Sequence, residues 1–254
     1  MIRRKPPRVV TWPILLIGVL LLGPVIALAF GMASLGGDWS RATHRPTGLA
    51  PSPASHREAI VQVYAARTFG WRGAFAVHTW IAAKPAGAER YTRYEVIGWY
   101  ARGGGSALSV SDVRAPDAEW YGAKPSVIRD LRGADAEPVI AKLPAAAASY
   151  PYASTYSAWP GPNSNTFVAH VAREIPGLRL ALPAHAVGKD YLSPGQVFAR
   201  SPSGAGYQLS LNGLLGVIVG GEEGFELNVL GLVAGVDFSR PAVKVPGFGD
   251  LPGR

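Results

Sequence analysis

The sequence predicts an α+β domain in which an antiparallel sheet has helices packed at one side, preceded by one N-terminal transmembrane helix. Its 254 residues, 48% of them hydrophobic, suffice for one well-cored domain of roughly 180 to 200 residues. Short runs of β-branched and aromatic residues recur between turns rich in Gly, Pro and Asn, which is typical of antiparallel strands. A few other runs carry apolar residues at helical spacing. A second full domain is not expected.

A membrane-crossing segment is predicted for residues 13–35, because no charged residue occurs between Arg8 and Asp38. At 1.5 Å per residue this run is long enough to cross a hydrocarbon core of about 30 Å. Residues 1–12 form a basic tail, which the positive-inside rule places in the cytoplasm. We therefore expect a single-pass protein of the cytoplasmic (inner) membrane, with its C-terminal domain on the outer, periplasmic side. The basic residues of the tail are Arg3, Arg4, Lys5 and Arg8.

A cleavable signal peptide is the alternative for the same segment. Pro24 interrupts the apolar run, and Ala27-Leu28-Ala29 has the small-x-small form of a cleavage site. The apolar run continues beyond Ala29, which favours the anchor. Either kind of segment exports the domain.

The rest of the chain divides into a linker, a domain and a tail. Residues 36–54 are rich in Gly, Pro, Ser and Thr without periodicity, as linkers are. Residues 55–240 form the expected exported α+β domain. Residues 241–254 are rich in Pro and Gly and are expected to form an extended C-terminal tail.

Strands and short helices are predicted in turn along the domain. It begins with a helix over 56–68, because Ser55 and Glu58 form a capping-box pattern before helically spaced apolar residues. The most prominent later helix starts at residues 163–165 and is stopped by Pro176-Gly177. The expected strands are 74–82, 91–100, 107–113, 196–199, 207–211, 213–219 and 225–236, with a hairpin turn at 220–224, and the other expected helices are 126–131 and 136–148.

Composition excludes several classes of function. The formal net charge is +8, but four basic residues lie in the first eight positions, which leaves 21 basic against 17 acidic residues. No basic stripe interleaved with aromatic residues occurs, so nucleic acid is not an expected partner. The absence of cysteine excludes disulfides, thiolate metal sites and cysteine nucleophiles. No G-x-S-x-G, P-loop, dinucleotide-binding or H-E-x-x-H motif occurs, and we expect neither a metal nor a cofactor.

The candidate catalytic residues are Ser164, His78 and Glu95. Ser164 lies at a predicted helix start, where free amides and the helix dipole stabilise developing negative charge. His78, on a predicted strand, can serve as the base that a serine nucleophile needs. Glu95 lies on the returning strand of the predicted hairpin, where it can fix the tautomer of the histidine.

Four further residues are candidates for binding a substrate. Asn163 and Asn165 flank the serine and can donate an amide hydrogen to an oxyanion. Trp80 lies on the same predicted strand face as the histidine. Tyr156 belongs to a cluster of aromatic residues just before the helix start.

A purely structural interpretation exists for the same residues. Small polar residues at a helix start are most often caps, which would account for Asn163, Ser164 and Asn165 without any reaction. A strand histidine beside a tryptophan is more often a hydrogen-bonded core residue than a catalytic base.

Two charged pairs also leave alternatives open. Glu95 would pair with Arg93 or Arg72 if it had only a structural role. His170 and Glu174 lie four residues apart on the predicted helix and are either metal ligands or a surface pair. We favour the surface pair, because no further cluster of ligands is visible in the sequence.

Four short motifs follow the basic, hydrophobic N-terminal segment. They are Trp71-Arg72-Gly73, Val77-His78-Thr79-Trp80, Tyr91-Thr92-Arg93-Tyr94-Glu95 and Pro162-Asn163-Ser164-Asn165-Thr166-Phe167. Together they resemble an uncharacterised bacterial family that is known only as a domain of unknown function. The resemblance covers most of the predicted exported part and implies no activity.

The order of a strand histidine and a later asparagine-rich helix start resembles a second group of proteins. These are the circularly permuted papain-like families, such as lecithin retinol acyltransferase-like and desumoylating-peptidase-like proteins. The resemblance implies a permuted papain-like fold with a cleft, in which His78 matches the base and Ser164 stands in place of the cysteine nucleophile. A hydroxyl is much less acidic than a thiol, so the serine implies an atypical serine enzyme or a cleft that has lost its chemistry.

These observations lead to one expected function and two alternatives. We expect a membrane-anchored protein of the cell envelope whose papain-like cleft binds a peptide- or acyl-type ligand, without requiring catalysis. The first alternative is a weak serine hydrolase or amidase that uses Ser164 and His78, with Glu95 in support. The second is an envelope interaction module with no pocket chemistry.

Overall fold

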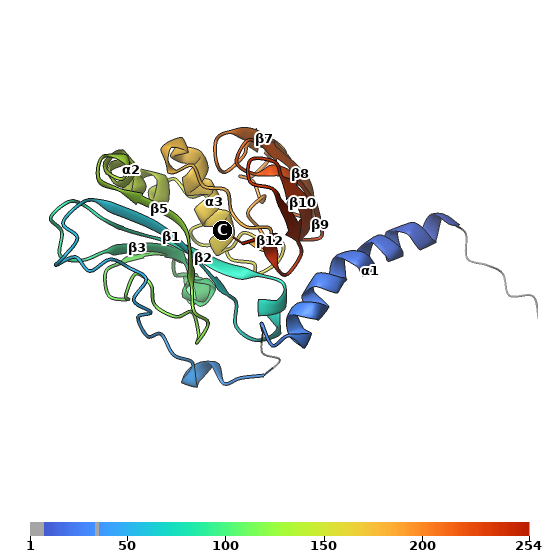
Figure 1. Ribbon diagram of the computed structural model, residues 1–254, viewed down its shortest axis with the longest axis horizontal. Coiled ribbons are helices and arrows are strands. Elements are labelled where there is room, and N and C mark those ends of the chain that lie inside the picture. The colour runs from blue at the N-terminus through green and yellow to red at the C-terminus, as the bar shows by residue number, and fades with distance from the viewer. Residues whose placement is uncertain (1–7, 34–35, 254) are drawn as a thin grey trace, which may run out of the picture.

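The computed structural model describes residues 8–33 and 36–253, and its two antiparallel sheets lie on either side of a central helix (Figure 1). A long N-terminal helix projects away from this body. The architecture is therefore α+β with one apolar N-terminal helix, as the sequence predicts.

The strands of the first sheet come from residues 60–132 and those of the second from residues 198–251. The first sheet has the order β4-β3-β2-β1-β5 and the second β12-β11-β10-β9-β8-β7-β6. The first sheet contains β1 (Ile60–Arg67), β2 (Val77–Lys84), β3 (Thr92–Val96), β4 (Leu108–Ser111) and β5 (Ser126–Arg132). The second contains β6 (Phe198–Arg200), β7 (Gly206–Leu211), β8 (Leu215–Gly220), β9 (Gly224–Val229), β10 (Leu232–Asp237), β11 (Ala242–Val245) and β12 (Gly249–Leu251).

Three α-helices and several short 3-10 helices complete the described part of the chain. The α-helices are α1 (Arg8–Ala29), α2 (Glu137–Ala148) and α3 (Ser164–Glu174). The 3-10 helices are η1 (Trp39–Arg41), η2 (Gly70–Ala74), η3 (Gly98–Gly104), η4 (Gly133–Asp135) and η5 (Pro176–Leu178).

Helix α1 confirms the predicted apolar N-terminal helix. Within the described residues, it is the one helix long and apolar enough to cross a membrane, over Trp12–Ala29. Its N-terminal half projects from the body in Figure 1, whereas Leu20 and Ala27 are buried against the domain. The basic residues predicted for the cytoplasmic tail at positions 3, 4 and 5 lie outside the described residues.

Two of the predicted helices are wrong, because the segments are strands. The segment predicted as a helix over 56–68 forms the central strand β1, and the segment 126–131 forms β5, which pairs with it. Seven of the eight residues of β1 are buried, since the sheet has neighbours on both of its faces. A strand covered on both faces loses its period of two, and its apolar residues then resemble a buried helix in the sequence.

The predicted hairpin and the two helices that follow it are confirmed. Strands β2 and β3 pair antiparallel with Ile81 opposite Tyr94, and β3 continues to pair with β4. Helix α2 matches the prediction over 136–148. Helix α3 begins at Ser164 with Asn163 as its N-cap, and it packs against β2 and β3.

The second sheet differs from the prediction in two places. The segment predicted as one strand over 225–236 is the hairpin of β9 and β10, because Leu230 and Gly231 both have positive φ values, of 56° and 83°, and form a tight turn. The segment predicted as an extended tail contributes β11 and β12. The last quarter of the chain is therefore one continuous antiparallel sheet.

The stretch predicted as a linker over 36–54 is tied to the domain by one carboxylate. Asp117 Oδ2 accepts hydrogen bonds from the backbone N–H groups of Thr47, Leu49 and Ala50, at 3.2, 2.7 and 3.3 Å. The chain therefore runs along the surface of the first sheet before β1 begins.

A buried cluster of charges lies beneath the second sheet. Glu226 of β9 forms ion pairs with Lys189 Nζ at 2.7 Å and with Lys244 Nζ of β11 at 2.6 Å. All three side chains are at most 2% exposed. Removing one partner from such a cluster leaves a buried charge uncompensated.

The substitution Glu226→Gln is expected to lower the free energy of unfolding by about 3 to 5 kcal/mol, because Lys189 and Lys244 lose their shared counter-charge in a buried site. Denaturant unfolding in detergent, followed by tryptophan fluorescence, measures the change. The matched control is Glu89→Gln at an exposed position, which should change stability by less than about 0.5 kcal/mol. An equal effect of the two substitutions would contradict the role of the cluster.

Candidate functional site

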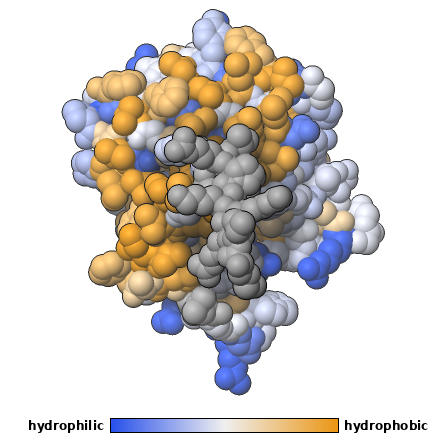
Figure 2. Space-filling view, turned by 90° about the vertical axis from the view of Figure 1, so that its right-hand side faces the viewer, coloured by the Kyte–Doolittle hydropathy of each residue, from blue (hydrophilic) through white to orange (hydrophobic). Residues whose placement is uncertain are grey.

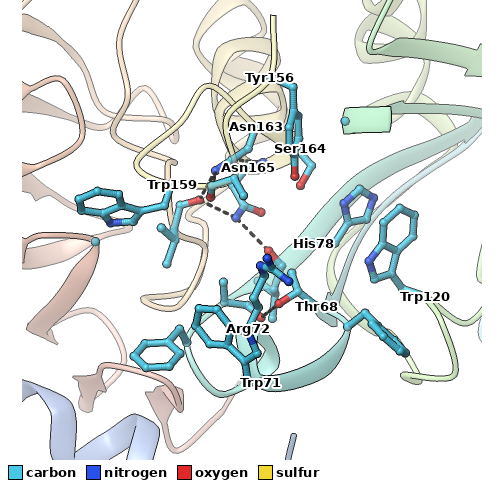
Figure 3. Close-up of a pocket in the computed structure, with 18 of the residues that line it drawn as sticks. Thr68, Trp71, Arg72, His78, Trp120, Tyr156, Trp159, Asn163, Ser164 and Asn165 are labelled. Atoms are coloured by element: carbon cyan, nitrogen blue, oxygen red, sulfur yellow. Dashed lines mark hydrogen bonds between the residues drawn. The ribbon is translucent and has the colours of Figure 1, made fainter. Parts of the chain in front are cut away.

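A cavity of about 1390 Å³ lies between the N-terminus of α3, strand β2 with η2, and the β9–β10 turn (Figure 3). Its walls are largely aromatic and apolar, and they include Trp71, Trp99, Trp120 and Trp159. His78 and Ser164 both line it. The cavity is therefore the place where the candidate catalytic residues meet the solvent or a ligand.

His78 is held in position by a carboxylate and by an aromatic ring. It projects from β2, and its Nε2 lies 3.1 Å from Glu95 Oε2 on β3. The indole of Trp120 stacks on the imidazole, with ring centroids 3.5 Å apart and planes inclined by 5°. In Figure 3 the histidine is seen between Ser164 and Trp120. Its ring thus has a fixed plane and one fixed hydrogen bond.

Glu95 is ionised because two cations and the histidine surround it. Arg93 Nε lies 2.9 Å from Glu95 Oε1, and Arg114 Nη1 lies 3.9 Å from the same oxygen. Burial alone would raise the pKa of Glu95, but the hydrogen bond from His78 and the charge of Arg93 outweigh it and lower the pKa to about 2. Glu95 therefore contacts both His78 and Arg93, the two partners that the sequence offered as alternatives.

The ionised carboxylate fixes the tautomer of His78. An ionised carboxylate can only accept hydrogen bonds, so Nε2 of His78 must carry the hydrogen that the two share. Burial lowers the pKa of His78 more than the hydrogen bond and charge of Glu95 raise it, so the ring is neutral at physiological pH. In the neutral ring, Nδ1 then carries the lone pair that a general base requires.

Ser164 is the first residue of α3, and its position is set by the residues on both sides. Asn163 Oδ1 accepts hydrogen bonds from the N–H groups of Asn165 and Thr166, at 2.9 and 3.2 Å. The side chain of Thr166 in turn accepts a hydrogen bond from the N–H of Asn163, which completes a capping box. The first N–H groups of a helix have no partner within it, and of these the cap serves Asn165 and Thr166, whereas the described hydrogen bonds include none from the N–H of Ser164.

The two asparagines have structural roles that compete with the predicted role in an oxyanion site. Asn165 Nδ2 donates to the carbonyl oxygens of Val77 and Val187, at 2.9 and 2.8 Å. Asn163 Nδ2 donates to Val187 O at 3.0 Å and to Ala158 O at 3.3 Å. Their amide hydrogens are thus already used, and both residues anchor the helix start to the surrounding loops.

Gly188 permits the close approach that this anchoring needs. Its φ is +92°, and an added Cβ would lie 2.5 Å from Asn163 Nδ2. Any other residue would therefore displace the cap that places Ser164 in the cavity.

Ser164 and His78 share the cavity without a hydrogen bond between them in the described part of the chain. Both residues are 4% exposed, so a ligand that reached them would be largely shielded from water. The cavity thus contains a hydroxyl group and a neutral imidazole, the two groups that a serine nucleophile and its base would supply. Hydrogen bonds between such groups often form only when a substrate is bound.

The other predicted binding residues lie in different places. Tyr156 lines the cavity, and its ring packs so closely on Gly98 that a Cβ there would lie 2.5 Å from the ring. Trp80 is fully buried beneath Arg93, whose guanidinium lies 4.1 Å from the indole ring, and it is not among the described residues that line the cavity. Trp80 lies two residues after His78 and therefore on the same face of β2, but Arg93 covers this face at Trp80.

Several residues that form the site were missed in the sequence. Trp120 lies in a segment with weak secondary-structure signals, and nothing in the sequence connects it with His78. Ile17 and Leu21 of α1 also line the cavity, although the sequence places them in a membrane anchor. Their part in the cavity depends on the packing of α1 against the domain, and local sequence patterns do not report such packing.

No ion pair within 4.0 Å joins His170 to Glu174 among the described residues, and His170 is half-buried. The imidazole Nε2 of His170 lies 3.0 Å from Ser149 Oγ and its ring makes an edge contact with Tyr150, while the charge of Glu174 acts on it only from a distance.

The comparisons with known proteins return one match. The model of a family described as Protein of unknown function (DUF3750) matches residues 58–191. This range includes His78, Glu95 and Ser164, whereas α1 and the second sheet lie outside it. The comparison with curated proteins and the comparison with solved structures each find no match. The comparisons therefore agree with the resemblance to a domain of unknown function and do not show the papain-like resemblance.

The substitution Glu95→Gln is expected to cost about 3 kcal/mol of stability at pH 7, because the shift of the Glu95 pKa from 4.5 to about 2 is equivalent to that energy. A depressed pKa stabilises the fold above the unfolded value and loses its effect as pH falls through the folded value. The difference between wild type and variant should therefore shrink from about pH 4.5 toward pH 2.

Denaturant unfolding at a series of pH values measures this difference. Glu137→Gln, at an exposed position on α2, is the control and should show a small difference at every pH. A difference for Glu95→Gln that stays constant over this range would contradict the ionised state of the carboxylate.

Proposed function

Since the chain belongs to the DUF3750 family of proteins of unknown function, we propose its function from the cavity itself: it is a membrane-anchored protein that binds the acyl chain of a membrane lipid. The observation that carries this proposal is the shared lining of the cavity. Ile17 and Leu21 of the apolar helix α1 line the same cavity as His78 and Ser164. A ligand that came from the bilayer beside α1 would reach these polar residues without crossing water.

The walls of the cavity suit an acyl chain better than a peptide. An extended peptide needs partners for its own N–H and C=O groups, usually from an exposed strand edge. Here the walls consist mainly of indole, phenyl and aliphatic groups, and the amide hydrogens of Asn163 and Asn165 are already used. A hydrocarbon chain requires only apolar contact, and its ester or amide group could lie near Ser164.

The proposed location is the cytoplasmic membrane, with the domain on its outer, periplasmic side. The support is the charge pattern of the sequence, in which four basic residues precede the apolar run and Asp38 follows it. In this orientation the ligand would be a lipid or lipid-modified molecule of the outer leaflet.

The substitution Ala158→Trp is expected to lower the affinity for an acyl ligand about tenfold or more, because the indole would occupy space in the cavity that the acyl chain needs. A loss of about 1.4 kcal/mol of binding free energy already gives a tenfold change. The probe is a phospholipid with a photoreactive acyl chain, added to the full-length protein in vesicles. Mass spectrometry then quantifies cross-links to cavity residues.

The matched control for this test is Ala141→Trp, at an exposed position of α2 away from the cavity. It should leave the yield of cavity cross-links unchanged. Absence of cavity cross-links in the wild type would contradict acyl binding and favour a module without pocket chemistry.

A second candidate function, that of a serine acyl hydrolase, is favoured by the hydrogen bond between His78 and Glu95. In this reaction His78 Nδ1 takes the proton of the Ser164 hydroxyl, and Oγ forms a bond to the acyl carbonyl carbon. The N–H of Ser164 faces the developing oxyanion at the N-terminus of α3.

The remaining steps restore the enzyme. The bond from the acyl carbon to the alcohol oxygen breaks, and His78 passes the proton to that oxygen. Water then attacks the acyl-serine with His78 again as base, which releases the acid and the free hydroxyl. Glu95 acts as a positioning residue that stabilises the imidazolium formed in each step.

The full-length protein is expected to react with a fluorophosphonate probe, and Ser164→Ala should abolish the labelling. His78→Gln should slow it by about 10² to 10⁴, the usual contribution of a general base. Ser154→Ala, another serine that lines the cavity, is the control and should label like the wild type. Unlabelled wild-type protein would count against the hydrolase and leave acyl binding intact.

A further inference from the structure

The outer face of the second sheet has the reverse of the usual distribution of side chains, and we propose that this face lies in the lipid bilayer beside α1. We call the outward-facing side chains of β6 to β12 the apolar sheet face. The occupant of this face is the same membrane that α1 enters.

The reversal is visible in the alternation along single strands. In β7, Tyr207, Leu209 and Leu211 are 51, 56 and 57% exposed, whereas Gln208 and Ser210 between them are at most 2% exposed. A soluble antiparallel sheet has its apolar residues inside and its polar residues outside. Alternation of this kind, with the apolar face outward, is the pattern of strands that face lipid.

The strand register joins these residues into continuous rows. One outward row crosses six strands and consists of Tyr207, Val219, Phe225, Val236, Val243 and Leu251. The adjacent inward row consists of Gln208, Ile218, Glu226, Gly235, Lys244 and Asp250. Among the described residues of β6 to β12, the one charged side chain on the apolar sheet face is Arg200, at the edge strand, where it lies over the ring of Tyr207.

The polar groups that would normally face water are satisfied inside the domain. Glu226 is paired with two lysines, and Asn228 Nδ2 donates to Asp190 Oδ2 at 2.6 Å. Gln208 Oε1 accepts a hydrogen bond from Arg173 of α3 at 3.0 Å. The inward polar side chains therefore need no water on the outer side of the sheet. The backbone groups of the inner strands β7 to β11 are paired with neighbours on both sides, and the sheet edges are confined to the short strands β6 and β12.

The packing of α1 sets the depth of the apolar sheet face. One stripe of the helix, from Ile17 through Leu20 and Pro24 to Ala27, contacts the domain. A Cβ on Gly23 would lie 2.0 Å from Pro246 O, so the helix touches the loop after β11 directly. Ile17 to Ala27 corresponds to about 15 Å along the axis, roughly half of a hydrocarbon core.

The position of α1 in the membrane determines the depth of the elements that pack against it. If α1 crosses the membrane over Trp12–Ala29, the part of the domain that flanks its C-terminal half lies at the depth of one leaflet. The elements at that place are η2 and β10, and η2 exposes 51% of Trp71, a residue type typical of membrane interfaces. Figure 2, which looks at this side of the molecule, shows hydrophobic residues over its left and upper parts and more hydrophilic residues over its right and lower parts.

A membrane explains the face better than a protein partner. An exposed apolar patch of this kind on a soluble domain usually marks an interface of some kind. Here α1, which is apolar enough to cross a membrane, projects from the same side of the molecule (Figure 1), so the bilayer around it would lie next to the sheet. The proposal rests on the placement of α1 and not on the ligand of the cavity.

The test uses the natural absence of cysteine. Leu209→Cys and Val243→Cys, 56 and 55% exposed in the wild type, are each labelled with an environment-sensitive fluorophore in the full-length protein. The protein is reconstituted in vesicles of phosphatidylcholine and phosphatidylglycerol. Quenching by nitroxide-labelled lipid and by aqueous iodide is then compared.

The control is Ala145→Cys, an exposed position on α2 at the opposite side of the body. Lipid quenching at both sheet positions should exceed that at the control at least about twofold, and iodide quenching should be weaker, as for residues at the acyl boundary. Lipid quenching at Val243→Cys alone would restrict the contact to the helix and overturn the proposal. Protection from both quenchers would also overturn it, because a protein would then cover the face.

Discussion

The anchoring of the α3 N-terminus by two asparagines is the interaction on which the rest of the structure depends. Asn165 joins the helix start to β2, through Val77 O and the hydroxyl of Thr79, and to the loop at Val187. Asn163 caps the helix and joins the same loop. Because this loop leads into the second sheet, one buried hydrogen-bond network fixes both sheets and α3 together, and unpaired members of such a network would be costly.

The same network explains why the candidate site exists where it does. It places Ser164 at the cavity wall, while the pairing of β2 with β3 places His78 beside Glu95. The arginines around Glu95 keep that carboxylate ionised, and the ionised carboxylate then fixes the protonation of the imidazole. A structural cap and a candidate nucleophile are therefore parts of one arrangement, and the two interpretations of this sequence stretch do not exclude each other.

The distribution of polarity connects the second sheet with the proposed acyl site. Polar side chains of the sheet are turned inward and paired, while its apolar side chains face the side from which α1 leaves. The cavity reaches the same side through Ile17 and Leu21. A domain seated in one leaflet would place this opening among the acyl chains, so the two proposals are physically consistent although they are tested separately.

The amino-acid sequence by itself determined the features that depend on local pattern. The apolar run gave α1, the capping residues gave the start of α3 at Ser164, and the hairpin pattern brought Glu95 near His78. It also gave the resemblance to a domain of unknown function, which the family match supports.

Only the tertiary structure decided the features that depend on distant contacts. Strand β1 could not be recognised, because residues buried on both faces show no alternation and so resemble a helix, and β5 owes its place to its pairing with β1, which local pattern does not report. The stacking of Trp120 on His78, the cover of Arg93 over Trp80 and the entry of α1 into the cavity wall each join residues far apart or on facing strands. Local periodicity shows which face of a segment is apolar, but not which residues pack against that face. In this protein those long-range contacts determine both the candidate site and its surroundings.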